Sequence, residues 1–221
     1  MRTARRAALV LLLATAALAV LARDVTHDGP MAAADHRIGA WLQAWLAPSA
    51  GAPWVGPLRW VSDLHKPRVL AVATIAVSLL LLALRRRGDA LFVLLVVPSG
   101  SVVNHLIKHT LERPRPGLAA TPGLPTDFAF PSGHVATATL LYGVLALLAL
   151  RHAPHLAVRG LAVAAAGLLV ALVGASRVVL GAHHASDVAG GALLGIGWIA
   201  VGVLVARAVR WRTGPRDGFR S

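Results

Sequence analysis

Six long apolar runs dominate the pattern of hydrophobic and polar positions along the chain. They lie at about 7–22, 69–84, 90–107, 135–150, 160–180 and 187–206. An α-helix needs about 20 residues to cross the hydrocarbon core, and flanking arginines can reach the interface where a run is shorter. Backbone groups in lipid must form hydrogen bonds within their own segment, so the runs are predicted to be helices. The expected fold is all-α: one polytopic membrane domain over residues 1–221, with six transmembrane helices in a bundle.

A shorter amphipathic segment falls between the first two runs, at about residues 35–47. Its apolar side chains recur at helical spacing, at Ile38, Trp41, Leu42, Trp45 and Leu46. Such a helix is too short to span, so we predict that it lies in the outer membrane interface with its Trp residues at headgroup level. This pattern favours a surface anchor over a segment that guides substrate.

Composition supports a membrane protein. The chain is 57% hydrophobic and 14% charged, whereas soluble domains are about one quarter charged. It has no Cys, which excludes disulfides, iron–sulfur clusters and thiolate zinc sites. The net charge of +13 does not indicate nucleic-acid binding, because the basic residues lie at the ends of the apolar runs rather than in one patch.

These basic residues also predict the orientation. One side of a six-helix count receives the N-terminus, Arg85–Arg87, Arg151, Arg159 and a basic tail at 207–221. The positive-inside rule makes that side cytoplasmic. The first run is either a retained helix or a cleaved signal peptide, and its length favours the helix. In both cases the loops 23–68, 108–134 and 181–186 lie outside.

The second of these loops begins with a basic cluster, Lys108, Arg113 and Arg115. It follows a helix whose outer half turns polar. Ser101, His105 and Lys108 are spaced i, i+4 and i+7, so they are expected to share one helix face. Taken alone, the cluster is compatible with ordinary charge beside a membrane helix.

The same loop ends in Pro131-Ser132-Gly133-His134, at the start of the fourth run. Helix N-termini expose unpaired N–H groups that bind anions. Ser132 can cap the helix or donate its hydroxyl, and Gly133 allows an oxyanion to approach the backbone. His134 would then reach the group to which the anion is attached. The simpler interpretation is a capped helix with an interfacial histidine.

A third cluster lies in residues 176–187. Arg177 ends the fifth run, where a charge is costly unless it is paired or near water. His183 and Asp187 are four residues apart, so on a helix the carboxylate can hold one ring N–H and leave the other nitrogen as a nucleophile. His184 is only three residues from Asp187, and the spacing therefore selects His183.

Together the clusters place two His, one Asp, one Lys, Arg side chains and a helix N-terminus on one membrane face. An anion with several oxygens suits this set, and phosphoryl is the natural candidate. Too few carboxylates converge to hold magnesium or a two-metal site, so no metal or cofactor is expected.

These motifs resemble those of the type 2 phosphatidic acid phosphatase superfamily, the lipid phosphate phosphatases. The signature K-x6-RP, PSGH and SR-x5-H-x3-D is matched by Lys108 to Arg115-Pro116, Pro131–His134, and Ser176-Arg177 to His183 and Asp187. Three motifs in order are highly specific. The resemblance implies a bacterial, plasma-membrane phosphatase with its active site on the extracytoplasmic face.

The resemblance also implies roles for these residues. His183 would attack phosphorus and Asp187 would orient it, while His134 would protonate the leaving oxygen and then activate water. The groups that would bind the phosphoryl oxygens are Lys108, Arg115, Ser132, the Gly133 N–H and Arg177.

Three nearby residues have no such role. Arg113 is outside the family pattern and is interpreted as loop charge or a headgroup contact. Asn104 and His105 either support the site or pack between helices.

The expected substrate is a lipid phosphomonoester or diphosphate in the outer leaflet. Phosphatidic acid, phosphatidylglycerol phosphate and polyprenyl diphosphates all remain candidates. One alternative is phosphoryl transfer to a sugar or lipid hydroxyl. A second is a vanadium haloperoxidase, but these enzymes are typically soluble, whereas this chain has the apolar runs of a membrane protein. A third is a transporter or scaffold. The charges cluster at one end of the helices, which disfavours transport. Gly191 and Gly195 favour close packing within the bundle, with a homo-oligomer as the alternative.

Overall fold

The computed structural model describes residues 2–46, 53–116 and 128–213. Over these residues it is all-helical, with the helices α1 (Arg2–Thr26), α2 (Pro30–Leu46), α3 (Val55–Leu64), α4 (Pro67–Ala83), α5 (Arg87–Leu111), α6 (Gly133–His152), α7 (Leu156–Val179) and α8 (Ala185–Thr213). Among them, α1, α5, α6, α7 and α8 are each long and apolar enough to cross a bilayer, and α3 with α4 would form a sixth span bent by 53°. The prediction of an all-α, multi-spanning protein is confirmed.

Several helices extend beyond their expected boundaries, and one helix was not expected. The last span continues as α8 to Thr213, so the first part of the expected tail is helical, and 214–221 lie outside the described residues. Helix α3 was not predicted, because Gly56 and Pro57 favour a loop. Pro57 falls in the first turn of α3, where a backbone N–H has no partner within the helix, so proline is tolerated there.

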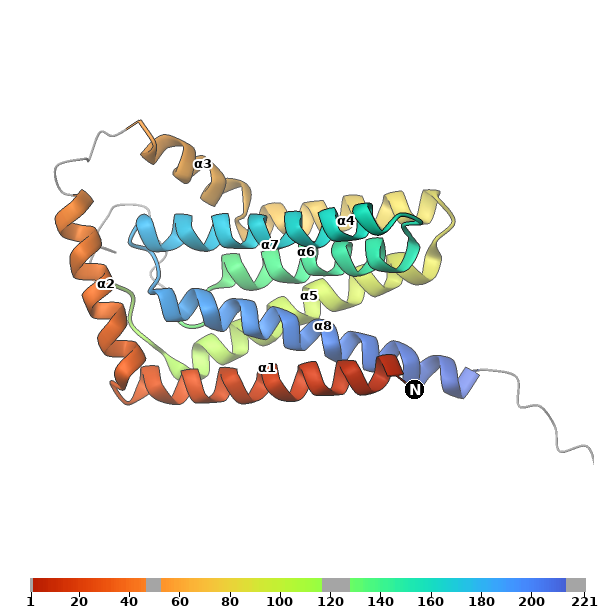
Figure 1. The fold of residues 1–221 in the computed structure, drawn as a ribbon, viewed down its shortest axis with the longest axis horizontal. Coiled ribbons are helices and arrows are strands. Elements are labelled where there is room, and N and C mark those ends of the chain that lie inside the picture. The colour runs from red at the N-terminus through yellow and green to blue at the C-terminus, as the bar shows by residue number, and fades with distance from the viewer. Residues whose placement is uncertain (1, 47–52, 117–127, 214–221) are drawn as a thin grey trace, which may run out of the picture.

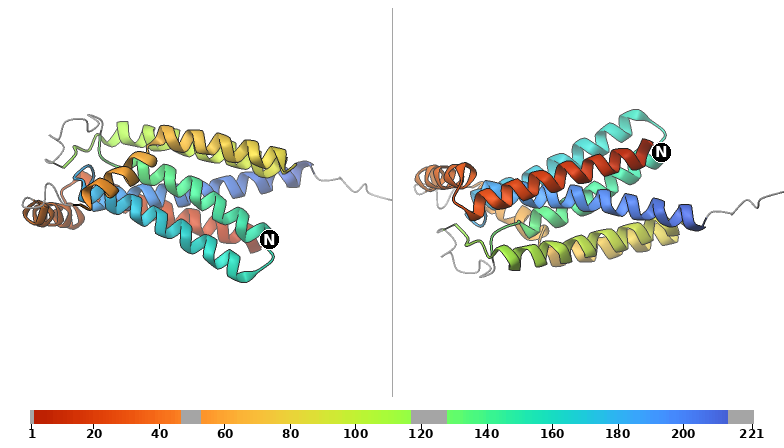
Figure 2. Two further views of the ribbon diagram at one scale, coloured as in Figure 1. Left: turned by 90° about the horizontal axis from the view of Figure 1, so that it is seen from above. Right: turned by 90° about the horizontal axis from the view of Figure 1, so that it is seen from below.

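The central helix of the bundle is α6, which packs against α4, α5, α7 and α8. The main core joins fully buried side chains of three helices: Val93 of α5, Val135 and Leu140 of α6, and Val173 of α7. On the outside, α1 lies along α8, as the views in Figures 1 and 2 agree. Apolar side chains such as Leu161 and Leu168 of α7 face outward, as lipid contact requires.

Two glycines of α8 permit its close approach to α6. A Cβ on Gly191 would lie 2.6 Å from the backbone oxygen of Ser132, and one on Gly195 would lie 2.7 Å from the side chain of Thr139. Packing of this pair within the bundle is therefore confirmed. The same contact holds the start of α6 beside the start of α8.

One end of the bundle is covered by α2, which runs across the long helices (Figures 1 and 2). Leu42 and Asp35 of α2 are buried, whereas Trp41 and Trp45 are 63% and 53% exposed. The two indoles stack at 6.0 Å. Exposed Trp side chains on a helix across the bundle end fit the expected position in the membrane interface.

The opposite end carries the turns between α4 and α5 and between α6 and α7 (Figure 1). There the buried Asp89 of α5 pairs with Arg151 at 3.2 Å and with His152 at 2.8 Å, both on α6. This pairing joins the two helices at the end where the arginines of the sequence pattern gather.

Candidate active site

All three clusters predicted from the sequence lie at the end of the bundle covered by α2. The α5 cluster faces inward there: Lys108 is buried, and its Nζ donates a hydrogen bond to the carbonyl of Phe128. Asn104 Nδ2 donates to the carbonyl of Pro131 at 3.5 Å. The expectation that His105 shares this face is wrong, because His105 is exposed. Asn104 is buried on the face of Lys108 instead. Residues three and four positions apart can both share a helix face, so the spacing did not distinguish His105 from Asn104.

The second cluster forms the first turn of α6. The N–H of Ser132 donates to the carbonyl of Asp187 at 2.9 Å, which ties this turn to α8. The Ser132 side chain does not cap α6. Its Oγ and His134 Nε2 are buried and have no hydrogen-bond partner among the described residues. Buried polar atoms are nearly always paired, so these two atoms mark positions where a ligand can bind.

The chain between α7 and α8 places His183 by a tight turn at Gly181. Gly181 has φ 66°, a left-handed conformation that glycine adopts without strain. The turn returns the N–H groups of Ala182 and His183 to the carbonyl of Arg177, at 3.0 Å and 3.2 Å. His183 therefore lies beside Arg177. His134 is near enough to both of them, and to Arg115, for Coulomb interactions.

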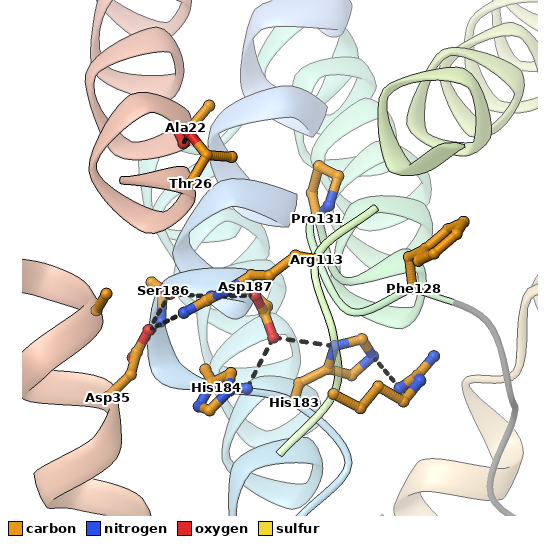
Figure 3. A network of polar contacts seen from close by, with 12 residues as sticks. Ala22, Thr26, Asp35, Arg113, Phe128, Pro131, His183, His184, Ser186 and Asp187 are labelled. Carbon is orange, nitrogen blue, oxygen red and sulfur yellow. Dashed lines mark hydrogen bonds and ion pairs between the residues drawn. The ribbon is translucent and has the colours of Figure 1, made fainter. Parts of the chain in front are cut away.

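The predicted pair of His183 and Asp187 is present and almost completely buried. His183 Nδ1 lies 3.4 Å from Asp187 Oδ2, and the same oxygen accepts the N–H of His184 at 2.8 Å (Figure 3). On the other side of the ring, Nε2 lies 3.2 Å from Arg115 Nη1. A guanidinium can only donate, so Nε2 accepts and the ring proton is assigned to Nδ1, facing Asp187.

Electrostatics favour the neutral form of His183. Burial lowers the pKa of His183 to about 4, with Asp187 opposing the shift and Arg115 and Arg177 adding to it. A neutral imidazole with its lone pair on Nε2 is the form that can act as a nucleophile. His184 is placed differently: its ring packs edge-on against His36 at 5.8 Å, and burial lowers its pKa.

Three residues that the sequence did not assign contact the site. Ser62 of α3 accepts a hydrogen bond from Arg177 Nη1 at 2.5 Å. Asp35 of α2 forms an ion pair with Arg113 Nη2 at 2.9 Å, and Arg113 Nη1 contacts Asp187 Oδ1 at 2.5 Å. The interpretation of Arg113 as loop charge or a headgroup contact is therefore wrong, because its side chain is buried between two carboxylates.

A cavity of about 280 Å³ lies beside these groups, between α2 and residues 113–116. Its polar lining includes His36, Arg115 and His184, and its apolar lining includes Val25 and Ala32. Arg115 thus borders both this cavity and His183. Among the residues that the structure describes, no three His, Asp or Glu side chains gather as ligands for a metal ion.

Comparisons with known proteins agree with the motifs. The sequence profile of the PAP2 superfamily matches residues 89–211. Phosphatidylglycerophosphatase B of Bacillus subtilis (strain 168) is 38% identical over 113 residues, which are 51% of this chain and 55% of that protein. The alignment thus spans about half the length of the curated relative.

A solved structure matches nearly the whole fold. It is the crystal structure of a transmembrane PAP2-type phosphatidylglycerolphosphate phosphatase from Bacillus subtilis, with a TM-score of 0.77 and 26% identity. The match covers 95% of this chain and 98% of that one, so it includes α1 to α4 as well as the region matched by the family profile.

Proposed function

The chain belongs to the PAP2 superfamily, and from that premise we propose that it is an integral membrane phosphatase that hydrolyses a lipid phosphate through a phosphohistidine intermediate. The observation that carries the proposal is the environment of His183: a buried imidazole with Asp187 on its Nδ1 side and Arg115 at its Nε2. A nucleophile, the group that orients it and a cation for the phosphoryl oxygens are thereby adjacent.

In the first step His183 Nε2 attacks phosphorus. The N–P bond forms as the bond from phosphorus to the lipid oxygen breaks, and His134 donates a proton to that departing oxygen. In the second step His134 accepts a proton from water, whose oxygen attacks phosphorus and displaces Nε2. The products are the dephosphorylated lipid and inorganic phosphate, and both histidines return to their starting states.

The phosphoryl oxygens are bound by Lys108, Arg115, Arg177, the Ser132 hydroxyl and the Gly133 N–H. These groups come from α5 and the segment after it, from α6 and from α7, and cationic side chains take the place that Mg²⁺ has in many phosphoryl-transfer enzymes. We expect the activity to persist in EDTA. Of the described polar atoms, Ser132 Oγ and His134 Nε2 support this assignment most directly, because both are buried without a hydrogen-bond partner.

Phosphatidylglycerol phosphate is the substrate that we favour, because both matched proteins carry that activity in their names. Phosphatidic acid and polyprenyl diphosphates are the comparison substrates. The site lies at the end covered by α2, opposite the arginine-rich turns. The positive-inside rule then places it on the extracytoplasmic face of the plasma membrane, where it would meet lipids of the outer leaflet.

The test is phosphate release by the detergent-solubilised full chain from each of these three lipids, with and without EDTA. His183→Ala should abolish release from every substrate, whereas His184→Gln should retain most of it. Measuring inorganic phosphate separates hydrolysis from transfer to another acceptor. Equal release by the wild type and His183→Ala would refute the mechanism, and loss of activity in EDTA would refute its metal independence.

A further inference from the structure

Arg113 lies between two buried carboxylates on different helices. Its Nη2 contacts Asp35 Oδ2 of α2 at 2.9 Å, and its Nη1 contacts Asp187 Oδ1 of α8 at 2.5 Å. Arg113 is 7% exposed, Asp35 3% and Asp187 0%. Ions buried to this degree are tolerated only when they are paired and hydrogen-bonded, so the three side chains depend on one another.

Ser186 closes this arrangement into a ring. Arg113 Nη1 donates to Ser186 Oγ at 2.7 Å, and that hydroxyl donates to Asp35 Oδ2. The N–H of Ser186 donates to Asp35 Oδ1 at 3.0 Å. Both oxygens of Asp35 are therefore held at the N-terminus of α8, where the helix dipole also favours a carboxylate (Figure 3).

The same ring sets the rotation of the Asp187 carboxylate. Arg113 holds Oδ1, which leaves Oδ2 to accept the N–H of His184 at 2.8 Å and to face His183 Nδ1 at 3.4 Å. Without Arg113, Oδ1 would lose its charged partner and the carboxylate could turn. Without Asp35, Arg113 would lose the contact that fixes its second nitrogen.

We infer that Asp35 and Arg113 are positioning residues for the catalytic pair. They hold Asp187 in the orientation that keeps the proton of His183 on Nδ1 and the lone pair of Nε2 directed at the phosphoryl group. This inference rests on the proposed function, and it gives α2 a part in the chemistry. The helix that covers the end of the bundle supplies Asp35, which holds Arg113 against Asp187.

Steady-state kinetics of Asp35→Asn and Arg113→Lys in the full chain test this inference. Asn keeps the size of Asp35 but not its charge, and Lys keeps the charge of Arg113 but not the fork that reaches both carboxylates. We expect kcat to fall by about 10-fold to 100-fold with KM changed less than about twofold, by analogy with residues that orient metal-ligating histidines, whose loss has effects of this order. The matched controls are Asp63→Asn and Arg59→Lys on exposed positions of α3, which should leave both constants unchanged.

Two further measurements test the positioning role if a variant does not fold or if turnover is absent. If Asp35→Asn fails to fold by size-exclusion chromatography, Ser186→Ala removes a single hydroxyl of the ring and should lower kcat in the same direction. In ¹⁵N-histidine NMR, with the His183 signal identified by its loss in His183→Gln, the wild type should show the proton on Nδ1 and the variants a mixture of tautomers.

The NMR result does not require turnover, so it separates failure of this inference from failure of the proposed function. A wild type that releases no phosphate but shows the Nδ1 proton, which is lost in Arg113→Lys, would overturn only the phosphatase assignment. Folded variants with wild-type kcat, or with the His183 tautomer unchanged, would overturn the positioning role.

Discussion

His183 Nε2 and Arg115 Nη1 lie 3.2 Å apart, so the nitrogen assigned as the nucleophile already accepts a hydrogen bond from a group assigned to the phosphoryl oxygens. Arg115 also donates to the carbonyl of Ala182 at 2.7 Å, which holds the guanidinium at the turn before α8. A phosphoryl group bound at His183 Nε2 would replace that nitrogen as a hydrogen-bond acceptor for Arg115. Arg115 thus favours the neutral form of His183 and lies where negative charge will develop on the phosphoryl oxygens.

Arg115→Lys should lower kcat/KM by about 100-fold to 1,000-fold, the range for loss of a positioned donor at a developing anion. Lysine keeps one positive charge but cannot contact both the Ala182 carbonyl and an oxyanion with the same planar geometry. Phosphate release at several substrate concentrations measures the effect. Arg86→Lys, an exposed arginine at the opposite end of the bundle, is the control. An Arg115→Lys enzyme with wild-type kcat/KM would contradict the assigned role.

The titration of His183 should be displaced far into the acid range. Burial lowers the pKa of its imidazole to about 4, whereas an exposed histidine titrates near 6.5. Because the neutral form is the nucleophile, His183 should remain competent as the pH falls from 6.5 to about 5, and protonation should inactivate it as the pH approaches 4. NMR titration of the ring signal that disappears in His183→Gln measures this directly. A midpoint near 6.5 would contradict the buried, neutral histidine.

Much of the architecture could be predicted because membrane helices leave a strong local signal. The apolar runs predict the long helices and their order along the chain, and the arginine pattern indicates which ends gather together. The spacing of His183 and Asp187 also predicts that their side chains lie close together, since four residues make about one helical turn. By contrast, Asn104 and His105 could not be separated by spacing alone, because both positions fit the face that carries Lys108.

The supporting residues left no comparable signal. Ser186 and Asp35 are 151 positions apart in the chain, and Arg177 and Ser62 are 115 apart. These contacts depend on how α2 and α3 fold back over the end of the bundle, which no local pattern specifies. From sequence alone, Asp35 at the start of an amphipathic helix is interpreted as a solvated charge, because only the packed fold shows that it is buried. Arg113 was misinterpreted for the same reason.

Gly191→Ala should disrupt the site through packing alone. The added Cβ would lie 2.6 Å from the backbone oxygen of Ser132 and 3.1 Å from the N of Ala136, and backbone atoms cannot move aside as a flexible side chain can. We expect a lower melting temperature and reduced phosphate release, since α8 and the first turn of α6 would be forced apart. The matched control is Gly167→Ala in α7, where nothing lies within 4 Å of the new Cβ.

The control should hold or raise stability, because alanine is favoured over glycine within a helix by up to about 1 kcal/mol. Thermal unfolding of the detergent-solubilised variants, together with their activity, provides the comparison. If Gly191→Ala and Gly167→Ala behave alike, the contact between α6 and α8 does not limit the site.

Ser62→Ala tests whether α3 contributes to the site or only covers it. The hydroxyl accepts a hydrogen bond from Arg177 Nη1 at 2.5 Å, and Ser62 is 3% exposed. Its removal takes one acceptor from a buried guanidinium, which costs about 1–3 kcal/mol when no other group replaces it. If Arg177 binds the phosphoryl group in the transition state, its altered placement should lower kcat/KM by about tenfold, a loss of about 1.4 kcal/mol. Thr110→Ala, at an exposed position of α5, is the control because its hydroxyl bonds back to Leu106 of its own helix at 3.0 Å. A Ser62→Ala enzyme that melts lower yet retains wild-type kcat/KM would assign Ser62 to the packing of α3 alone, and the contact with Arg177 would then have no part in catalysis.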